Sequence, residues 1–318
     1  MLKDTFMQKF NTISMLKIIE TLKEQLLNIS PKEVVEFEVI NPDYASSVYS
    51  GEKIEIGGEN FIYRGYKNWV DLAQILHCRM LTPIVVSQKK VIIRFEKLNK
   101  DESFHNMTTQ KEEKYGLESI FSLIHKNEEA SFIAYYLKSL QNVDVNRRNR
   151  ILNLGVNSGD EFDVIVEFAS NFKNLELVGI DYCTSAVKQA KEKFHGYPNI
   201  DIFLHDINEL NSLNFEKFDL IISVATLQSS NLEFNKLLMS IVQNQLKREG
   251  AIILGFPNCR WIDGEMVYGA KVKNYAFSEM GLLYKDVMFA KKYLQQKKFR
   301  VTITGKDYIF LTATSIVK

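Results

Sequence analysis

The chain has 318 residues, of which 46% are apolar and 25% charged, and its formal net charge is +1. This length and composition predict one enlarged or two ordinary globular domains with a large buried core. The near-neutral charge excludes an overall electrostatic attraction to nucleic acid or an anionic membrane, and leaves only a local basic patch open.

The N-terminal segment carries charges throughout and has no unbroken apolar run, so we expect neither a signal peptide nor a membrane-spanning helix. Its apolar residues recur at three- and four-residue steps from Leu2 to Leu26. This pattern predicts one packing helix, with an interfacial membrane helix as the alternative. Three scattered cysteines without metal-ligand spacing predict no disulfide scaffold and no metal site, and favour a cytoplasmic location. The oligomeric state is not determined by these patterns.

Residues 33–98 read as a small α+β region. Helical spacing of apolar residues predicts a helix over 66–81. Alternating or β-branched runs predict strands over 34–40, 53–58, 60–66 and 89–98. A polar stretch without periodicity, 99–116, then separates two expected domains, an N-terminal α+β domain over 1–110 and a second domain over 111–318.

The second domain begins with two expected helices, at about 117–125 and 129–141, and then alternates strands with helices. Five such βα units predict a buried, mostly parallel sheet with helices on both faces. The helix after the fourth strand is expected to end at Glu249–Gly250, where glycine can adopt the left-handed cap conformation. A closing β-hairpin adds two strands, at least one of them antiparallel.

Polar residues and glycines follow the first three strands of this sheet. The first strand runs into Gly155-Val156-Asn157-Ser158-Gly159, where glycines allow close backbone approach to a ligand at a helix N-terminus. The second strand ends at Asp181, placed to accept hydrogen bonds from two ribose hydroxyls, and the third is followed by Asp206. Alone, the glycine loop is equally explained as a turn, and each acid is more often a surface or capping carboxylate, but their succession at three strand ends points to a nucleotide-like ligand.

With these features, residues 115–318 resemble the class I S-adenosylmethionine-dependent methyltransferases, whereas the N-terminal domain resembles no family. The glycine loop is similar to the first motif of that family, FDLIISVATLQSS to its fourth-strand segment, and the closing hairpin to its extra strand pair. The resemblance implies a Rossmann-like seven-stranded sheet and S-adenosylmethionine as cofactor. It implies cofactor contacts at Tyr115, Asn153, Gly155, Asn157, Gly159, Asp181, Tyr182, Asp206, Ile207 and Ser223.

Two positions depart from the family pattern. Asn153 stands where an acidic residue is usual, and Asn157 stands where a glycine is usual. Asparagine adopts left-handed conformations more readily than most residues, so Asn157 can replace glycine. These two departures are the support for a further reading, a protein that binds the cofactor without catalysing transfer.

The loop after the fifth strand, 255–279, is the expected acceptor site, because long loops in compact domains often carry function. Its alternative role is to pack onto the sheet. The resemblance implies no universal catalytic residue, and Gln228 and His105 are candidates; a loop histidine is also explained by solvation alone. The acceptor candidates are Asn258, Arg260, Trp261, Glu265 and Tyr268.

The leading functional hypothesis is a methyltransferase for a small or medium-sized acceptor, with the N-terminal domain shaping the acceptor site. The competing hypothesis is RNA modification, most plausibly of tRNA, with the N-terminal domain binding RNA. Acidic residues interleaved along the N-terminal strands oppose the RNA hypothesis. The basic residues of the same region favour it, and they are Lys53, Arg64, Lys67, Lys89, Lys90, Arg94 and Lys97.

Overall fold

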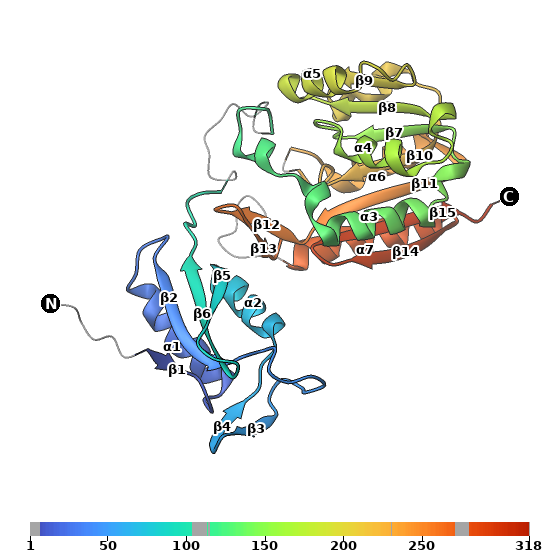
Figure 1. Ribbon diagram of the computed structural model, residues 1–318. Helices are drawn as coiled ribbons and strands as arrows, with labels where there is room; N and C mark the ends of the chain where they lie inside the picture. The colour runs from blue at the N-terminus through green and yellow to red at the C-terminus, as the bar shows by residue number, and fades with distance from the viewer. Residues whose placement is uncertain (1–6, 104–112, 114, 230, 271–279, 318) are drawn as a thin grey trace. The chain divides into compact units, whose positions relative to one another are not determined.

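The computed structural model describes residues 7–103, 113, 115–229, 231–270 and 280–317 (Figure 1). The chain forms two compact units. The first comprises residues 1–103 together with 261–268, and the second comprises 104–260 and 269–318. No helix within the described ranges combines the length and hydropathy needed to cross a membrane.

The first unit is built on a four-stranded sheet that packs against two helices. The sheet order is β1 (Gln8–Lys9), β2 (Val34–Ile40), β6 (Lys90–Lys97) and β5 (Cys78–Val85), with β1 parallel to β2 and the other pairs antiparallel. The helices are α1 (Met15–Leu27) and α2 (Tyr66–Ile75), and β3 (Lys53–Ile56) and β4 (Glu59–Ile62) form a separate hairpin. Phe37 and Phe95 from the sheet meet Trp69 from α2 in the core.

Two expectations for this unit were wrong. A continuous helix from Leu2 is interrupted, because Gln8–Lys9 form a strand and α1 begins only after Ser14, whose Oγ accepts the N–H of Lys17 at 3.3 Å. The helix expected over 66–81 ends at Ile75, because His77 adopts a left-handed φ of 55° and the chain then enters β5. In both places the helical spacing of apolar residues extends beyond the helix that the structure forms.

A hairpin from far along the chain completes the first unit. It consists of β12 (Cys259–Ile262) and β13 (Glu265–Tyr268), and Ile262 and Val267 form a small core with Leu98. An ion pair between Lys32 and Asp263 holds its turn, and the Asp263 carboxylate also accepts the N–H of Asn99 at 2.8 Å. Residues 261–268 therefore belong to the first unit, although they follow a strand of the second.

The second unit contains the predicted Rossmann-like seven-stranded sheet. The strands are β7 (Arg150–Leu154), β8 (Glu176–Asp181), β9 (Ile200–Leu204), β10 (Phe218–Val224), β11 (Leu246–Pro257), β14 (Phe299–Gly305) and β15 (Tyr308–Ser315). Their order is β14-β15-β11-β10-β7-β8-β9. Only β15 runs against its neighbours β11 and β14, so the mostly parallel sheet and the antiparallel closing hairpin are confirmed.

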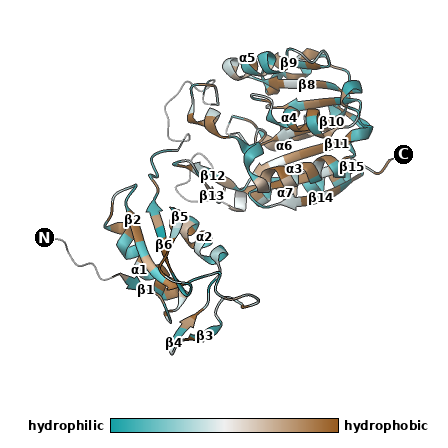
Figure 2. Cartoon of the chain, in the orientation of Figure 1, coloured by the Kyte–Doolittle hydropathy of each residue, from teal (hydrophilic) through white to brown (hydrophobic). Residues whose placement is uncertain are grey.

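Helices cover both faces of this sheet. Leu311 packs in a core with α6 (Phe234–Asn244) and α7 (Met280–Gln296), whereas the adjacent Phe310 packs on Phe132 and Tyr136 of α3 (Ala130–Asn142). Because successive side chains of a strand point to opposite faces, α3 lies on the face opposite α6 and α7. Two further helices, α4 (Asp160–Phe168) and α5 (Thr184–Lys193), follow β7 and β8. The strands β8, β10 and β11 are largely brown in Figure 2, as expected for a sheet buried on both faces.

Helix boundaries in the second unit differ from expectation at two places. The helix expected at 117–125 is only the 3₁₀ turn η2 (Ile120–Leu123), and another turn, η3 (Lys126–Glu128), leads into α3. The helix α6 ends at Asn244 rather than at Gly250, because Leu246 already pairs with Phe218 in the sheet. Further 3₁₀ turns are η4 (Val145–Arg147), η5 (Phe172–Asn174) and η6 (Ile207–Leu213).

Candidate functional site

The carboxyl ends of adjacent parallel strands lie at one edge of the sheet in the second unit. β7 ends at Leu154, between β8 ending at Asp181 and β10 ending at Val224. The loops that leave these ends converge, and in open α/β sheets this edge forms the ligand crevice.

The first of these loops, residues 155–159, is called the glycine loop below. Gly155 and Gly159 have left-handed φ of 77° and 90°, and a Cβ atom on them would lie 2.0 Å from Thr226 Oγ1 and 2.2 Å from the Phe194 ring, respectively. Asn157 has a φ of 45°, so it adopts the left-handed conformation expected for the glycine it replaces. Conformation and packing together therefore require glycine at both ends of the loop.

The Asp181 carboxylate joins this loop to the end of β8. Its two oxygens accept backbone N–H groups, Oδ2 from Asn157 and Oδ1 from Cys183, each at 2.9 Å. The side chain is almost completely buried, and this burial raises the pKa of the carboxyl although the backbone N–H bonds oppose the shift. Each carboxylate oxygen can accept more than one hydrogen bond, so acceptor capacity toward a ligand remains.

The segment before the sheet lies against the same loop. Asn157 Nδ2 donates to the backbone oxygen of Tyr115 at 2.9 Å, and the Tyr115 ring meets Phe121 edge to face with centroids 5.0 Å apart. Glu113 accepts the N–H of Ser185 at 3.3 Å, at the start of α5. Burial raises the pKa of Tyr182, which directly follows Asp181, to about 12. Tyr115, Asn157, Asp181 and Tyr182 therefore lie close together, and their contact with a cofactor stays a prediction.

Other predicted cofactor residues have evident structural roles. Ser223 is buried, and its Oγ donates to the Leu154 carbonyl at 3.2 Å, which ties β10 to β7. Asp206 caps η6 by accepting the N–H of Asn208 at 2.8 Å. The Ile207 side chain lies in the core that α6 and α7 cover, so only its backbone is available to a ligand.

Beyond β10 the backbone is strained and one amide oxygen lacks a partner. Ala225 has a left-handed φ of 59°, a conformation that costs a residue with a Cβ about 1–2 kcal/mol. Gln228 Nε2 lies 3.5 Å from the carbonyl of Gly255, and its buried Oε1 has no hydrogen-bond partner in the part of the chain that the structure describes. An unpaired buried amide oxygen is costly, which makes Gln228 a candidate ligand contact.

The five acceptor candidates are divided between the two units. Asn258, in the second unit, donates its side-chain Nδ2 to the Lys306 carbonyl at 3.1 Å, and Arg260 donates to the Gly269 carbonyl at 3.1 Å. Trp261, Glu265 and Tyr268 belong to the first unit, where Glu265 pairs with Arg79 at 2.6 Å. His105 and residues 271–279 lie outside the described residues.

Two functional candidates were missed in the sequence, Lys126 and Glu161, which form an ion pair at 2.9 Å beside the glycine loop. Thr226 packs on Gly155. Glu161 could have been noticed from its place two residues after Gly159, but Lys126 has no local signal because its partner is distant in the chain. Among the described residues, no group of three or more His, Cys, Asp or Glu is arranged to hold a metal ion.

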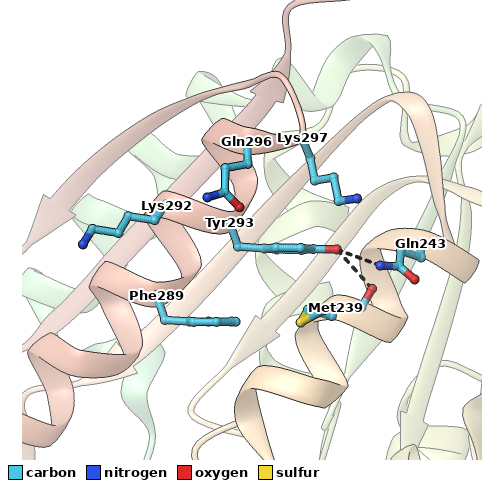
Figure 3. Close-up of a pocket in the computed structure, with 7 residues that line it drawn as sticks. All are labelled: Met239, Gln243, Phe289, Lys292, Tyr293, Gln296 and Lys297. Atoms are coloured by element: carbon cyan, nitrogen blue, oxygen red, sulfur yellow. Dashed lines mark hydrogen bonds between the residues drawn. The ribbon is translucent and has the colours of Figure 1, made fainter.

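A separate pocket of about 460 Å³ lies between α6 and α7 (Figure 3). Tyr293 spans it from α7, and its hydroxyl donates to the Met239 carbonyl and accepts from Gln243 Nε2, both at 3.4 Å. Lys297 Nζ lies 5.6 Å from the centre of the Tyr293 ring. The last turns of both helices precede the amino ends of β11 and β14, so the pocket is remote from the crevice. Its polar groups largely satisfy one another, and we interpret it as a helix–helix junction.

The chain has one family match and several distant structural neighbours. A family model described as "Methyltransferase domain" matches residues 146–303, and no curated protein matches the chain. A precorrin-6y C5,15-methyltransferase from Geobacter metallireducens GS-15 is 10% identical, with 57% of this chain and 89% of that chain covered and a TM-score of 0.40. The N-methyltransferase NodS from Bradyrhizobium japonicum WM9, solved with S-adenosyl-L-homocysteine, is 14% identical, with 60% and 90% covered and a TM-score of 0.41. A putative rRNA methylase from Clostridium thermocellum is 13% identical, with 56% and 95% covered and a TM-score of 0.41.

Proposed function

We propose that the protein is a class I methyltransferase that uses S-adenosylmethionine, because a family model of a methyltransferase domain matches residues 146–303. The observation that carries this proposal is the link between Asp181 and the N–H of Asn157. It joins the end of β8 to the glycine loop, so that a carboxylate and a loop of left-handed residues face one crevice.

The residues present fit this cofactor. Gly155 and Gly159 leave the loop backbone free of side chains, and the carboxylate of Asp181 can accept the hydroxyl hydrogens of a ribose. Tyr182 and Asp206 follow the ends of β8 and β9, where they would contact the adenine. We therefore assign cofactor binding to the glycine loop and to these three residues.

The chemistry demands positioning more than it demands acid–base catalysis. When bound, the cofactor supplies a methyl group on a sulfonium, which is already activated for transfer. The protein then has to orient the acceptor and exclude water. We assign the orienting role to Gln228, because its buried Oε1 can accept a hydrogen bond from an acceptor hydroxyl or amine.

We propose a small or medium-sized acceptor rather than RNA, with the first unit as the acceptor-recognition domain. The basic side chains that favoured RNA are mostly engaged within the first unit. Lys90 pairs with Glu59 at 2.6 Å and Arg94 with Glu36 at 2.9 Å, whereas Lys97 donates to the backbone of α1 and Arg64 to the carbonyl of Ile13. The carboxylate partners of Lys90 and Arg94 lower the positive potential that phosphate binding requires, and the carbonyl partners of Lys97 and Arg64 occupy their donors. We place the protein in the cytoplasm, where its three buried free cysteines would stay reduced.

Transfer of labelled methyl from S-adenosylmethionine tests this proposal. The purified protein is incubated with a small-molecule extract and, separately, with total RNA. We expect label in the small-molecule fraction, and we expect Gln228→Ala to lower that incorporation more than it lowers cofactor affinity. Incorporation into RNA alone would refute the proposed acceptor class, and cofactor binding with no incorporation into either fraction would favour the non-catalytic reading.

A further inference from the structure

Two buried polar side chains and one partly buried lysine, from three different elements, meet behind the glycine loop. They are Lys126 from η3, Asn153 from β7 and Glu161 from the first turn of α4. Asn153 Nδ2 donates to Glu161 Oε2 at 3.2 Å, and Lys126 Nζ lies 2.9 Å from Glu161 Oε1. Asn153 and Glu161 have no exposed surface, which makes this cluster unlike any surface ion pair of the molecule.

The cluster is balanced in charge. A buried carboxylate is strongly unfavourable unless it is paired and hydrogen-bonded, and Glu161 has both an ammonium and an amide as partners. Asp160, which is partly exposed, adds a second carboxylate 3.5 Å from Lys126 Nζ. Although burial opposes the charged form, the carboxylates of Glu161 and Asp160 raise the pKa of Lys126 above its ordinary value. The ammonium is therefore fully charged at neutral pH.

Asn153 and Glu161 lie on either side of the glycine loop in the sequence. Asn153 precedes Gly155 by two residues and Glu161 follows Gly159 by two residues. The hydrogen bond between their side chains consequently joins the two ends of the loop. It fixes the distance between the end of β7 and the start of α4, which is the span that the loop has to cross.

The neutral side chain at position 153 follows from the same geometry. The aspartate oxygen that would replace Asn153 Nδ2 would lie about 3 Å from Glu161 Oε2, so that an N–H donor would be replaced by a like charge. Both groups would be without exposed surface, where water cannot screen the repulsion. Aspartate at 153 and glutamate at 161 are therefore mutually incompatible in this structure.

We propose that Lys126, Asn153 and Glu161 are positioning residues that hold the two ends of the glycine loop. In this arrangement the buried carboxylate is supplied by Glu161 of α4, and the residue at 153 is neutral because a second carboxylate there would be repelled. This inference rests on the proposed function for its binding readout. Asn153 is then a complement to Glu161 and does not weaken the cofactor site.

A charge-swap pair tests the inference. Asn153→Asp alone places two carboxylates together, whereas Asn153→Asp with Glu161→Gln moves the carboxylate to β7 and keeps one donor and one acceptor. Unfolding is measured in urea, and binding of S-adenosylhomocysteine is measured by calorimetry at low temperature on the variants whose unfolding curves have a folded baseline. Glu167→Gln, an exposed substitution on the same helix, is the matched control.

We expect Asn153→Asp to weaken S-adenosylhomocysteine binding by about tenfold or more. The affinity of this variant is expected to recover as the pH is lowered, because protonation of one carboxylate removes the repulsion. The double variant is expected to bind within about threefold of the wild type, a difference of less than 1 kcal/mol. Asn153→Asp that binds as tightly as the wild type, or a double variant no better than the single one, would overturn the inference. If the wild type does not bind the ligand, the proposed function fails, while rescue of the unfolding midpoint by the double variant still tests the pairing of the three residues.

Discussion

The backbone N–H of Asn157 donates a 2.9 Å hydrogen bond to the carboxylate of Asp181, across 24 residues of sequence. The side chain of Asn157 donates in turn to the Tyr115 carbonyl. One residue thus holds the middle of the glycine loop to the end of β8 and to the segment that precedes the sheet.

Two substitutions at Asn157 distinguish the effect of its left-handed backbone conformation from the effect of its side-chain hydrogen bond to Tyr115. Asn157→Ala is expected to destabilise the fold by about 1–2 kcal/mol, because alanine at a φ of 45° is strained and the bond to Tyr115 is lost. Asn157→Gly loses only the side-chain hydrogen bonds, to the Tyr115 carbonyl and from the N–H of Ser158, and is expected to be destabilised by about 1 kcal/mol. Urea unfolding measures both. Equal losses for the two variants would show that the left-handed conformation is not what position 157 requires.

A second prediction concerns Gly155 and Thr226. Gly155→Ala is expected to unfold at lower urea concentration, because the new methyl group meets Thr226 Oγ1 in a left-handed backbone. In Gly155→Ala/Thr226→Ala the contacts with Oγ1 and Cγ2 are removed, but the contact with the Cβ of residue 226 at 2.7 Å and the backbone strain of about 1 kcal/mol stay, so partial rescue is expected. Gly196→Ala, where the added methyl group meets nothing within 4 Å, is the control. Full rescue or no rescue would contradict the division of the destabilisation into a collision with Thr226 and a strain of the backbone.

The third prediction concerns the hairpin that completes the first unit. Although burial opposes the charged form, the N–H of Asn99 and the ammonium of Lys32 lower the pKa of Asp263 below its ordinary 3.8. A lowered pKa means that the carboxylate stabilises the fold above pH 3.8 and that this contribution disappears as the pH falls through the lower, folded-state pKa.

Asp263→Asn is accordingly expected to destabilise the protein by about 1–3 kcal/mol at neutral pH, because an acceptor of buried N–H groups loses its charge. The difference from the wild type should narrow below pH 3.8. Unfolding free energies at neutral and acidic pH measure this. A difference that stays constant with pH would mean that the charge of Asp263 contributes nothing.

The fourth prediction concerns Lys126 at alkaline pH. Its folded-state pKa lies above the ordinary value of 10.5, so the stabilisation by the ion pair is complete below pH 10.5 and is lost as the pH rises through the folded-state pKa. The groups facing the ammonium are Glu161, Asp160 and the Tyr308 hydroxyl.

We expect the wild type to be more stable than Lys126→Met by about 3–5 kcal/mol near pH 8, because the variant leaves Glu161 buried without its ammonium. The gap should begin to close only above pH 10.5. Unfolding curves of both proteins across this range test the prediction, with Lys138→Met, on the exposed side of α3, as the control. A gap that closes well below pH 10.5 would be inconsistent with a raised pKa.

The parts of the fold that repeat a local pattern were predictable. The alternation of strands and helices after residue 150 specified the sheet, and the glycine loop, Asp181 and the closing hairpin specified its type, because each is encoded within a few neighbouring residues. Helix ends were less predictable: His77 and Leu246 act through backbone conformation and strand pairing that apolar spacing does not reveal.

Long-range pairs were not predictable from the sequence. Lys126 with Glu161 and Lys32 with Asp263 become neighbours only after folding, so no local spacing points to them. For the same reason, the sequence did not reveal that residues 261–268 belong to the first unit. The loop 255–279 was expected to form a single acceptor site. In the structure, Glu265 instead pairs with Arg79, and Asn258 donates to the carbonyl of Lys306.

Calorimetric titration of S-adenosylhomocysteine into the wild type and Asp181→Ala tests the central claim most directly, with Asp201→Asn, an exposed substitution on β9, as the control. We expect the wild type and the control to bind equally, and Asp181→Ala to lose about 10- to 100-fold in affinity with the loss of a charge-assisted acceptor. A wild type that does not bind, or an Asp181→Ala variant that binds as tightly as the wild type, would contradict the assignment of this crevice to S-adenosylmethionine.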